Sequence, residues 1–282
     1  MSIYVRQAKY SDKEKAVYVE GQSTPNLRYL SRMWDSFVES VDEPLFIAFY
    51  EGEMAGVGKL SILYDGSAWL ETLRVDKKFQ GRGIGKAIYK AYLDHAKKLG
   101  ISELRMYTNH KNAASAGLAK INGFSLAGQY SGADLNMTNY IPPNEIAAFE
   151  KITDNSLAYE LLEPLGKKWD NHMIFNRTFY PFNKSLVHGL TCDASVYYHK
   201  HSESVLVYGA RFMPDRGMNI GMFSGNSDLC LDFAAYMTYM QDLPKLSIMF
   251  PPQLDDVKSA LLKKGYTMQP EDCIVMERLF SK

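Results

Sequence analysis

Residues 69–86 read WLETLRVDKKFQGRGIGK, and they predict a strand, a tight glycine-rich loop and a helix that runs to about Leu99. The first part is rich in bulky and β-branched residues that suit a pleated strand. Gly81, Gly83 and Gly85 remove three side chains, so the loop can adopt positive φ and its backbone can approach a ligand closely. The helix directs its unpaired N–H groups and the positive end of its dipole at the loop. The stretch therefore predicts an anion site, for which phosphate is the usual ligand.

Two common nucleotide motifs do not fit the order Gln80-x-x-Gly83-x-Gly85. The Walker loop needs Gly-Lys followed by Ser or Thr, whereas Lys86 is followed by alanine. The Rossmann fingerprint needs a third glycine at position 88, which is isoleucine, and an early βαβ unit. Here three strands are expected before the loop instead: residues 45–50 and 54–64 form a hairpin, and Asp65-Gly66 turns into the third strand.

A second segment follows the loop helix. Gly100 ends that helix, and residues 103–107 predict the next strand. Asn112 then precedes a small-residue helix over residues 113–121, which Gly123-Phe124 closes. Asn112 stands eleven positions before Gly123.

Together these two segments resemble the GCN5-related N-acetyltransferase (GNAT) superfamily over about residues 3–140. The resemblance rests on the glycine loop after a strand ending Leu73-Arg74-Val75-Asp76 and on the spacing of Asn112 from Gly-Phe. It implies an α+β fold, in which a central, mostly antiparallel sheet is flanked by helices. It also implies acetyl-CoA as co-substrate and a primary amine of a small molecule or protein as acceptor.

The same resemblance implies roles for the residues around the loop. The backbone of residues 73–75 would pair with the pantetheine amides, and the N–H groups of residues 81–85 would hold the pyrophosphate. A splayed gap between the Val75 and Tyr107 strands would admit the thioester. Cations at Lys77, Lys78, Arg82 and Lys86 would pair with phosphates, although they could equally form a solvated helix face. The acetyl-CoA set is thus Leu73, Arg74, Val75, Gln80, Gly81, Arg82, Gly83, Ile84, Gly85, Lys86 and Asn112.

Glu71 is the expected general base, because strand alternation places it on one face with Trp69 and Leu73. A carboxylate there can take the amine proton directly or through water. The alternative for Glu71 is a cross-strand ion pair with Lys59 or Arg105.

The general acid is less clearly marked. GNAT enzymes often have tyrosine four residues before the Gly of Gly-Phe, but this position is Ala119. Tyr107, Ser115 or water would then protonate the thiolate, or the thiolate would leave unassisted. Asn112 is expected to help hold CoA or, alternatively, to cap the following helix, and His110 is expected near the thioester.

In the family, two helices after the first strand cover the acceptor site. The second of them is expected at about residues 27–39, where the aromatic side chains of Tyr29, Trp34 and Phe37 would line a pocket.

The second half of the chain repeats the first. Leu104 to Gly123 and Leu246 to Gly265 each span 19 positions and read strand, linker, helix, Gly-aromatic. The two copies are offset by 142 positions, from Leu104 to Leu246. The same offset places Gln80 on Met222 and Gly83 on Gly225, so residues 222–227 would be the second loop. We expect no CoA site there, because one glycine remains and side chains occupy the backbone path.

We accordingly predict a tandem GNAT arrangement with a degenerate C-terminal copy. The domains would be residues 1–141 and 142–282, with the boundary near Pro142-Pro143 and a helical start over residues 145–169.

Composition narrows the class of protein. The chain has 282 residues, 46% of them hydrophobic, and its 32 basic and 32 acidic residues balance, which argues against nucleic-acid or membrane partners. Cys192, Cys230 and Cys273 are scattered and indicate reduced thiols of a cytoplasmic protein rather than disulfides. His199 and His201 flank a turn, and no metal site is expected.

Two alternatives to an acetyltransferase stay open. One is a non-catalytic acyl-CoA-binding or regulatory protein, because the usual acid tyrosine is absent. The other is an interaction module that kept the fold but lost CoA binding.

Overall fold

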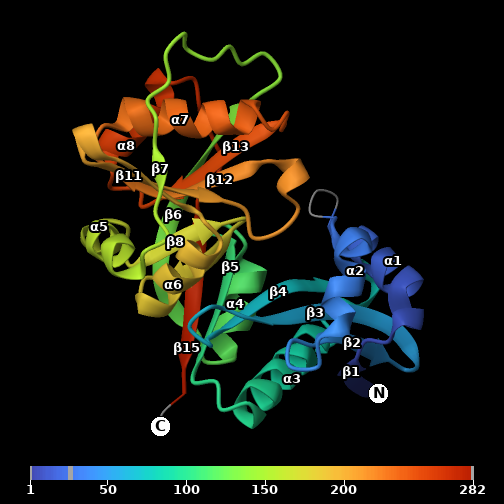
Figure 1. Ribbon diagram of the computed structural model, residues 1–282. Helices are drawn as coiled ribbons and strands as arrows, with labels where there is room; N and C mark the ends of the chain where they lie inside the picture. Colours follow the sequence, from blue (N-terminus) through green and yellow to red (C-terminus); the bar gives the residue numbers. More distant parts are fainter. Residues whose placement is uncertain (1, 25–27, 281–282) are drawn as a thin grey trace. The chain divides into compact units, whose positions relative to one another are not determined.

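The computed structural model describes residues 2–24 and 28–280. The chain forms two compact units (Figure 1). Unit 1 comprises residues 1–106, 113–126 and 276–282, and unit 2 comprises residues 107–112 and 127–275. The predicted boundary near Pro142-Pro143 is the point in the sequence at which one copy ends and the next begins. It stays a prediction.

The first half of the chain forms these elements: β1 (Ile3–Gln7), η1 (Tyr10–Asp12), α1 (Lys13–Ser23), α2 (Leu30–Glu39), β2 (Leu45–Tyr50), β3 (Glu53–Ile62), β4 (Ala68–Val75), η2 (Lys77–Phe79), α3 (Ile84–Lys98), β5 (Glu103–Asn109), α4 (Ala113–Ile121) and β6 (Ser125–Asn136). The expected second helix is α2, and position 27, where it was expected to begin, lies outside the described residues.

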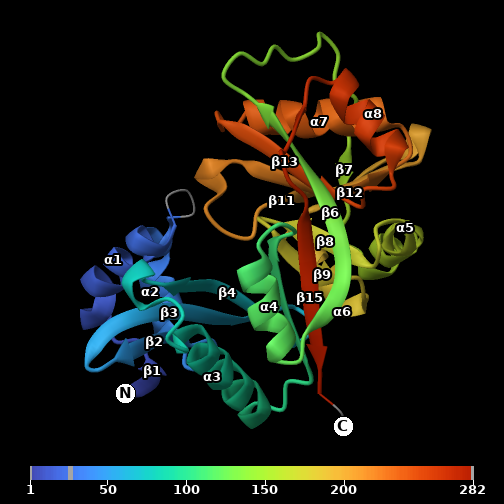
Figure 2. The ribbon, with the colours of Figure 1, turned by 180° about the vertical axis from the view of Figure 1, so that it is seen from behind.

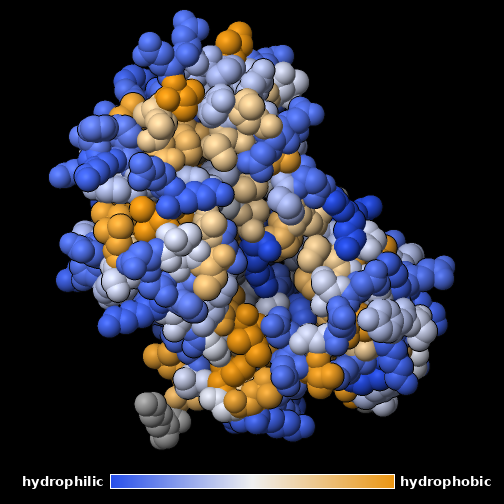
Figure 3. All heavy atoms as spheres, in the orientation of Figure 1, coloured by the Kyte–Doolittle hydropathy of each residue, from blue (hydrophilic) through white to orange (hydrophobic). Residues whose placement is uncertain are grey.

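The strands of unit 1 pair in the order β1-β2-β3-β4-β5, antiparallel until the parallel step from β4 to β5. α3 packs against β1 to β4, and Figure 2 shows it beside α4. α1 and α2 bury a separate cluster against β2 and β3, with Trp34 and Ile47 fully buried in it. Their outward faces are mostly hydrophilic in Figure 3. α2 therefore has one apolar stripe, as amphipathic surface helices do, whereas α1 buries Ala16 and Val19 together with the charged Glu20.

The second half forms these elements: β7 (Glu150–Lys151), α5 (Asn155–Lys168), β8 (His172–Phe175), β9 (Thr178–Pro181), α6 (Lys184–Cys192), β10 (Val196–His199), η3 (Lys200–Ser202), β11 (Ser204–Gly209), η4 (Pro214–Arg216), β12 (Met218–Ser224), α7 (Ser227–Tyr239), β13 (Lys245–Phe250), α8 (Asp255–Lys263), β14 (Thr267–Met268) and β15 (Cys273–Leu279).

Unit 2 repeats the topology of unit 1. Its strands pair in the order β7-β10-β11-β12-β13-β6, with β14 also on β6, and the step from β12 to β13 is parallel. α7 follows β12 and packs on β11 to β13, as α3 follows β4 and packs on its strands. The predicted α+β fold with two tandem copies is therefore confirmed.

One local expectation for the second half, the helical start over residues 145–169, is wrong at its beginning. Residues 145–149 are not helical, and α5 begins at Asn155 because the Asp154 side chain accepts the Leu157 N–H and caps the helix there. Glu150 and Lys151 instead form β7, which pairs with β10.

Within the described residues, no helix combines the length and apolarity that crossing a bilayer requires.

Candidate functional site

The loop between β4 and α3 has two glycines in the left-handed region. The φ angle is +77° at Gly81 and +84° at Gly83. Gly83 is the N-cap of α3, and the helix ladder starts with the Ala87 N–H donating to the Gly83 carbonyl at 3.0 Å. The N–H groups of the first turn therefore lack intrahelical acceptors, and Gly83, as the N-cap, has no side chain to cap them.

Space around these glycines is open. A Cβ on Gly81 would meet nothing within 4 Å, and one on Gly83 would meet only Ile3 Cδ1, at 3.7 Å. Gly85 differs, because it lies in the first turn of α3 and a Cβ there would be 2.8 Å from Leu118 Cδ2 on α4. Packing within the chain thus explains Gly85, whereas Gly81 and Gly83 fit a loop whose backbone meets an external group.

Charges around the loop are not equally available. The Arg82 guanidinium donates to the Tyr50 hydroxyl at 3.3 Å and lies over the Tyr50 ring. Lys78 pairs with Glu53, and this hydrogen bond raises the pKa of Lys78. Lys86 is exposed in the first turn of α3. A basic residue at a helix N-terminus is unfavourable toward the dipole, so Arg82 and Lys86 suit a site that receives an anion.

Gln80 and Lys77 complete the loop. The Gln80 side-chain amide donates to the Val75 carbonyl at 3.3 Å, which ties the loop to the end of β4. Lys77 begins η2, whose N-terminus is capped by the Asp76 carboxylate accepting the Lys78 N–H. Ile84 is buried as the first residue of α3. These contacts fix both ends of the loop.

β4 contains a bulge immediately after Glu71. The register between β3 and β4 shifts so that Gly58 stands opposite both Thr72 and Leu73, and Thr72 has φ +58°. The strict alternation expected along 69–75 therefore ends at Glu71. Glu71 itself is 7% exposed and accepts a hydrogen bond from the Ser61 hydroxyl at 2.7 Å.

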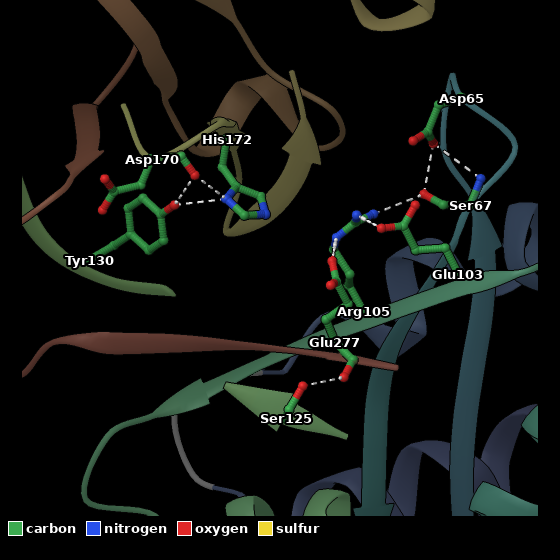
Figure 4. Close-up of polar contacts among 9 residues, drawn as sticks. All are labelled: Asp65, Ser67, Glu103, Arg105, Ser125, Tyr130, Asp170, His172 and Glu277. Carbon is green, nitrogen blue, oxygen red and sulfur yellow. Dashed lines mark hydrogen bonds and ion pairs between the residues drawn. The ribbon is translucent and has the colours of Figure 1, made fainter. Parts of the chain in front are cut away.

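Of the two cations considered as partners of Glu71, Lys59 stands directly opposite it in the pairing of β3 with β4, so this alternative stays open; both cations also have other contacts. The Lys59 ammonium donates to the Phe37 and Glu43 carbonyls. Arg105 is buried and forms ion pairs with Glu103 and with Glu277, the latter at 2.9 Å (Figure 4). Burial is the main cause that raises the pKa of Glu103, opposed by the Arg105 charge and reinforced by Glu277. Arg105 is thus the centre of a structural ion cluster.

β4 loses its parallel partner β5 before the bulge. β4 pairs with β5 only at Ala68 and Trp69, although β4 continues to Val75. On the other side, Arg74 and Val75 still pair with β3. The Arg74 guanidinium turns back to the Leu73 carbonyl at 3.0 Å. Residues 73–75 therefore end the strand with an edge that β5 does not occupy within unit 1.

The remaining candidates are divided between the units. Tyr107, His110 and Asn112 belong to unit 2, whereas Ser115 on α4 belongs to unit 1. The Tyr107 ring lies 6.2 Å from that of Phe179 on β9. The Asn112 N–H donates to the Asn109 carbonyl, and the His110 N–H donates to the Asp272 carbonyl.

Ala119, at the position of the usual tyrosine, is fully buried in α4. Its carbonyl accepts the N–H groups of Asn122 and Phe124. This position is therefore part of the packing of unit 1 and offers no proton donor.

Sequence reasoning missed one contact beside Glu71. The Tyr29 hydroxyl is hydrogen-bonded to Thr72 Oγ1 at 2.8 Å. The other aromatic residues expected in an acceptor pocket belong to the core, since Trp34 is fully buried and Phe37 is 6% exposed. Only Tyr29, at the start of α2, is partly exposed. Its position in the aromatic segment was a signal, but nothing in the sequence marked Thr72.

The second copy closes the corresponding place. β12 runs through Met222, Phe223 and Ser224, which pair with β11, so these residues are strand and not the loop that the 142-residue shift suggested. Only Gly225 and Asn226 separate β12 from α7, and the Asn226 side chain accepts the Leu229 N–H at 3.2 Å. A Cβ on Gly225 would lie 2.5 Å from Ser204 Oγ.

Two histidines of unit 2 have polar partners within the unit. The hydroxyl of buried Tyr130 is 2.8 Å from His172 Nδ1, which also lies 2.9 Å from the Asp170 carbonyl (Figure 4). His199 Nδ1 bonds the Ser202 hydroxyl at 2.7 Å in the turn before β11. Among residues 2–24 and 28–280, no three His, Cys, Asp or Glu side chains are grouped to hold a metal ion.

Comparison with known proteins identifies the segment that carries this loop. Residues 10–124 match the model of the Acetyltransferase (GNAT) family. The spermine/spermidine N(1)-acetyltransferase of Bacillus subtilis (strain 168) is 33% identical over 58 residues, which are 18% of this chain and 38% of that protein. The chain thus matches well under half of the length of this curated relative.

Two solved structures share the fold of the whole chain. A GCN5-related N-acetyltransferase from Sphaerobacter thermophilus has a TM-score of 0.65 at 11% identity, covering 98% of this chain and 95% of that one. A tandem GNAT protein from the clavulanic acid biosynthesis pathway has a TM-score of 0.60 at 12% identity, covering 100% and 99%. At such identities the likeness concerns the fold alone.

Proposed function

Because residues 10–124 belong to the GNAT family of acetyltransferases, we propose that the protein transfers an acetyl group from acetyl-CoA to a primary amine. The observation that carries this proposal is the uncapped start of α3 behind Gly81 and Gly83. Backbone N–H groups at a helix N-terminus bind phosphate, and both glycines leave room for the pyrophosphate to approach.

The residues present fit acetyl-CoA as a substrate. Gln80, Gly81, Gly83, Ile84 and Gly85 would supply the loop backbone. Arg82 and Lys86 would neutralise phosphate charge, and the edge formed by Leu73, Arg74 and Val75 would pair with the pantetheine amides. Asn112 would assist from the segment before α4.

Transfer would proceed by direct attack. The amine nitrogen bonds to the thioester carbonyl carbon, the carbon–sulfur bond breaks, and the CoA thiolate leaves. Glu71, directly or through water, would accept the proton that the amine loses. Tyr107 or Ser115 would be the donor that protonates the thiolate, although a CoA thiolate can also leave unassisted. Holding amine and thioester together supplies much of the rate enhancement.

Polyamines are the first acceptors to test, because the matched relative is named for spermine and spermidine. The assay would measure CoA release with spermidine and acetyl-CoA. Glu71→Gln should lower kcat by about 100-fold while the dissociation constant of acetyl-CoA, from calorimetry, stays within about twofold. Glu160→Gln, which neutralises an exposed carboxylate of α5, is the matched control and should leave both unchanged.

Other outcomes have distinct meanings. Acetyl-CoA binding without acetylation of any amine in a broad panel would favour the non-catalytic acyl-CoA-binding alternative. An unchanged kcat in Glu71→Gln would remove Glu71 as the base. No binding of acetyl-CoA by the wild type would contradict the whole proposal.

A further inference from the structure

Thr72 has a backbone conformation that its side chain disfavours. It has φ +58° in the middle of β4 and is 3% exposed. A β-branched residue at positive φ is a genuine outlier, and such strain persists only where surrounding contacts hold it. Strained residues cluster at functional sites, and Thr72 directly follows Glu71.

One identified contact that holds Thr72 comes from the start of α2. The Tyr29 hydroxyl lies 2.8 Å from Thr72 Oγ1, and the Tyr29 ring meets Phe37 edge-on at 6.4 Å between centroids. The backbone of Tyr29 is fixed in turn by Glu20, a carboxylate 2% exposed on α1. It accepts the N–H groups of Tyr29 and Leu30 at 3.1–3.2 Å. Tyr29 is thus held at its backbone N–H and at its side-chain hydroxyl.

The bulge at Thr72 determines the course of the residues that follow. Two residues of β4 stand opposite Gly58 there, and the pairing of β4 with β5 has already ended at Trp69. An extra residue in one strand bends that strand and re-aims its backbone groups. The course of residues 73–75 therefore depends on the conformation of Thr72.

We propose that Tyr29 is a positioning residue: its hydrogen bond to Thr72 holds the bulge of β4 and so aligns residues 73–75 for the pantetheine arm of acetyl-CoA. This inference rests on the proposed function and extends it to the helix pair on the opposite face of the sheet from α3. Tyr29 acts through Thr72 and makes no contact with the reacting atoms in this role.

Two substitutions remove the hydrogen bond from opposite sides. Tyr29→Phe deletes the hydroxyl, and Thr72→Val deletes Oγ1 while keeping a β-branched side chain of similar volume. Each should weaken acetyl-CoA binding, measured by calorimetry, by about fivefold, and the double variant should be no weaker than either single one. Tyr18→Phe on α1, where the ring is 57% exposed, is the matched control and should bind as the wild type.

A rescue separates positioning from general damage. Glycine adopts positive φ without strain, so in Thr72→Gly the bulge no longer needs the hydrogen bond from Tyr29. Thr72→Gly should bind acetyl-CoA within about twofold of the wild type, and adding Tyr29→Phe should change it no further. Thermal melting followed by circular dichroism shows whether each variant is folded. If Tyr29→Phe does not fold, Thr72→Val provides the test of the hydrogen bond.

The results distinguish the two proposals. If the wild type binds acetyl-CoA and Tyr29→Phe binds it equally well, the positioning role is overturned and the proposed function is left intact. The same holds if Tyr29→Phe weakens binding as much in the Thr72→Gly background as in the wild type. Failure of the wild type to bind acetyl-CoA would overturn the proposed function, and this inference with it.

Discussion

The junctions between β4 and α3 and between β12 and α7 occupy the same place in the two copies and differ in what fills them. The first has eight residues, 76–83, with two open glycines and an uncapped helix. The second has only Gly225 and Asn226, and Asn226 caps the helix. Both Gly83 and Gly225 have φ +84°, yet Gly225 is packed against Ser204.

The charges at the N-termini of α3 and α7 also differ. The first turn of α3 carries Lys86, whereas that of α7 carries Asp228, which pairs with Lys263 at 2.7 Å. An acidic side chain at a helix N-terminus interacts favourably with the dipole, and a basic one does not. The second copy thus provides its own anion and cap. The first turn of α3 has neither an acidic residue nor a side-chain cap from Gly83, and this difference teaches which copy to test first for CoA binding.

The largest expected effect comes from closing the open junction. Gly83→Val places a β-branched side chain at positive φ and over the exposed N–H groups of α3. It should weaken acetyl-CoA binding by about 100-fold in calorimetry, since two charge-assisted hydrogen bonds of about 1.5 kcal/mol are lost. Stoichiometry gives the complementary result: one site per chain supports the comparison, and a second site would contradict it.

At the closed junction, the expected loss is in stability. Gly225→Ala would place a Cβ at 2.5–2.9 Å from Ser204 and should lower the free energy of unfolding by about 3 kcal/mol in urea denaturation, with acetyl-CoA affinity unchanged. Gly66→Ala is the control for φ alone, since Gly66 has φ +80° and open space, and it should cost about 1 kcal/mol. Equal losses would show that contact with Ser204 is unimportant.

Removing the cap tests whether α7 could become an anion site. Asn226→Ala should lower the free energy of unfolding by about 1 kcal/mol, because the Leu229 N–H loses its acceptor. It should not create a second acetyl-CoA site, since β12 still occupies the path of a loop. A gain of binding would mean that the cap alone closes the second copy.

Charge at the open junction should matter less than its backbone. Arg82→Gln should weaken acetyl-CoA binding about threefold at low salt and less at high salt, because exposed charges are screened. Lys98→Gln, at the far end of α3, is the matched control and should have no effect on binding. If Arg82→Gln weakened acetyl-CoA binding as much as Gly83→Val does, the cation and not the loop backbone would be the main contributor to affinity.

The smallest effect concerns the acidic end of α7. The hydrogen bond from Lys263 is the main cause that lowers the pKa of Asp228. A carboxyl group whose pKa is lower in the folded state stabilises the protein at pH values above its unfolded-state pKa. This stabilisation is lost as the pH falls through its folded-state pKa. Asp228→Asn should therefore cost about 0.5 kcal/mol at pH 7, discounted for exposure, and nothing once Asp228 is protonated. A difference that persists at low pH would contradict this.

Local patterns predicted much of the fold and part of the site. The glycines between 81 and 85, the hairpin before them and the matching 19-residue spacings indicated a tandem GNAT fold, which is confirmed. These features are short-range, because turns, periodicity and helix ends depend on neighbouring residues. The length of the second junction was misjudged, because a constant shift assumes that no residues are missing between β12 and α7.

The residues of this chain by themselves predicted the strands and main helices from α2 to α4, the glycine loop and the candidate base Glu71. Only the tertiary structure decided that Thr72 is strained and bonded to Tyr29, 43 positions away, and that Gly81 is open while Gly225 is packed. The physical reason is that propensities and motifs act along the chain, whereas bulges, burial and hydrogen-bond partners depend on residues that folding brings together.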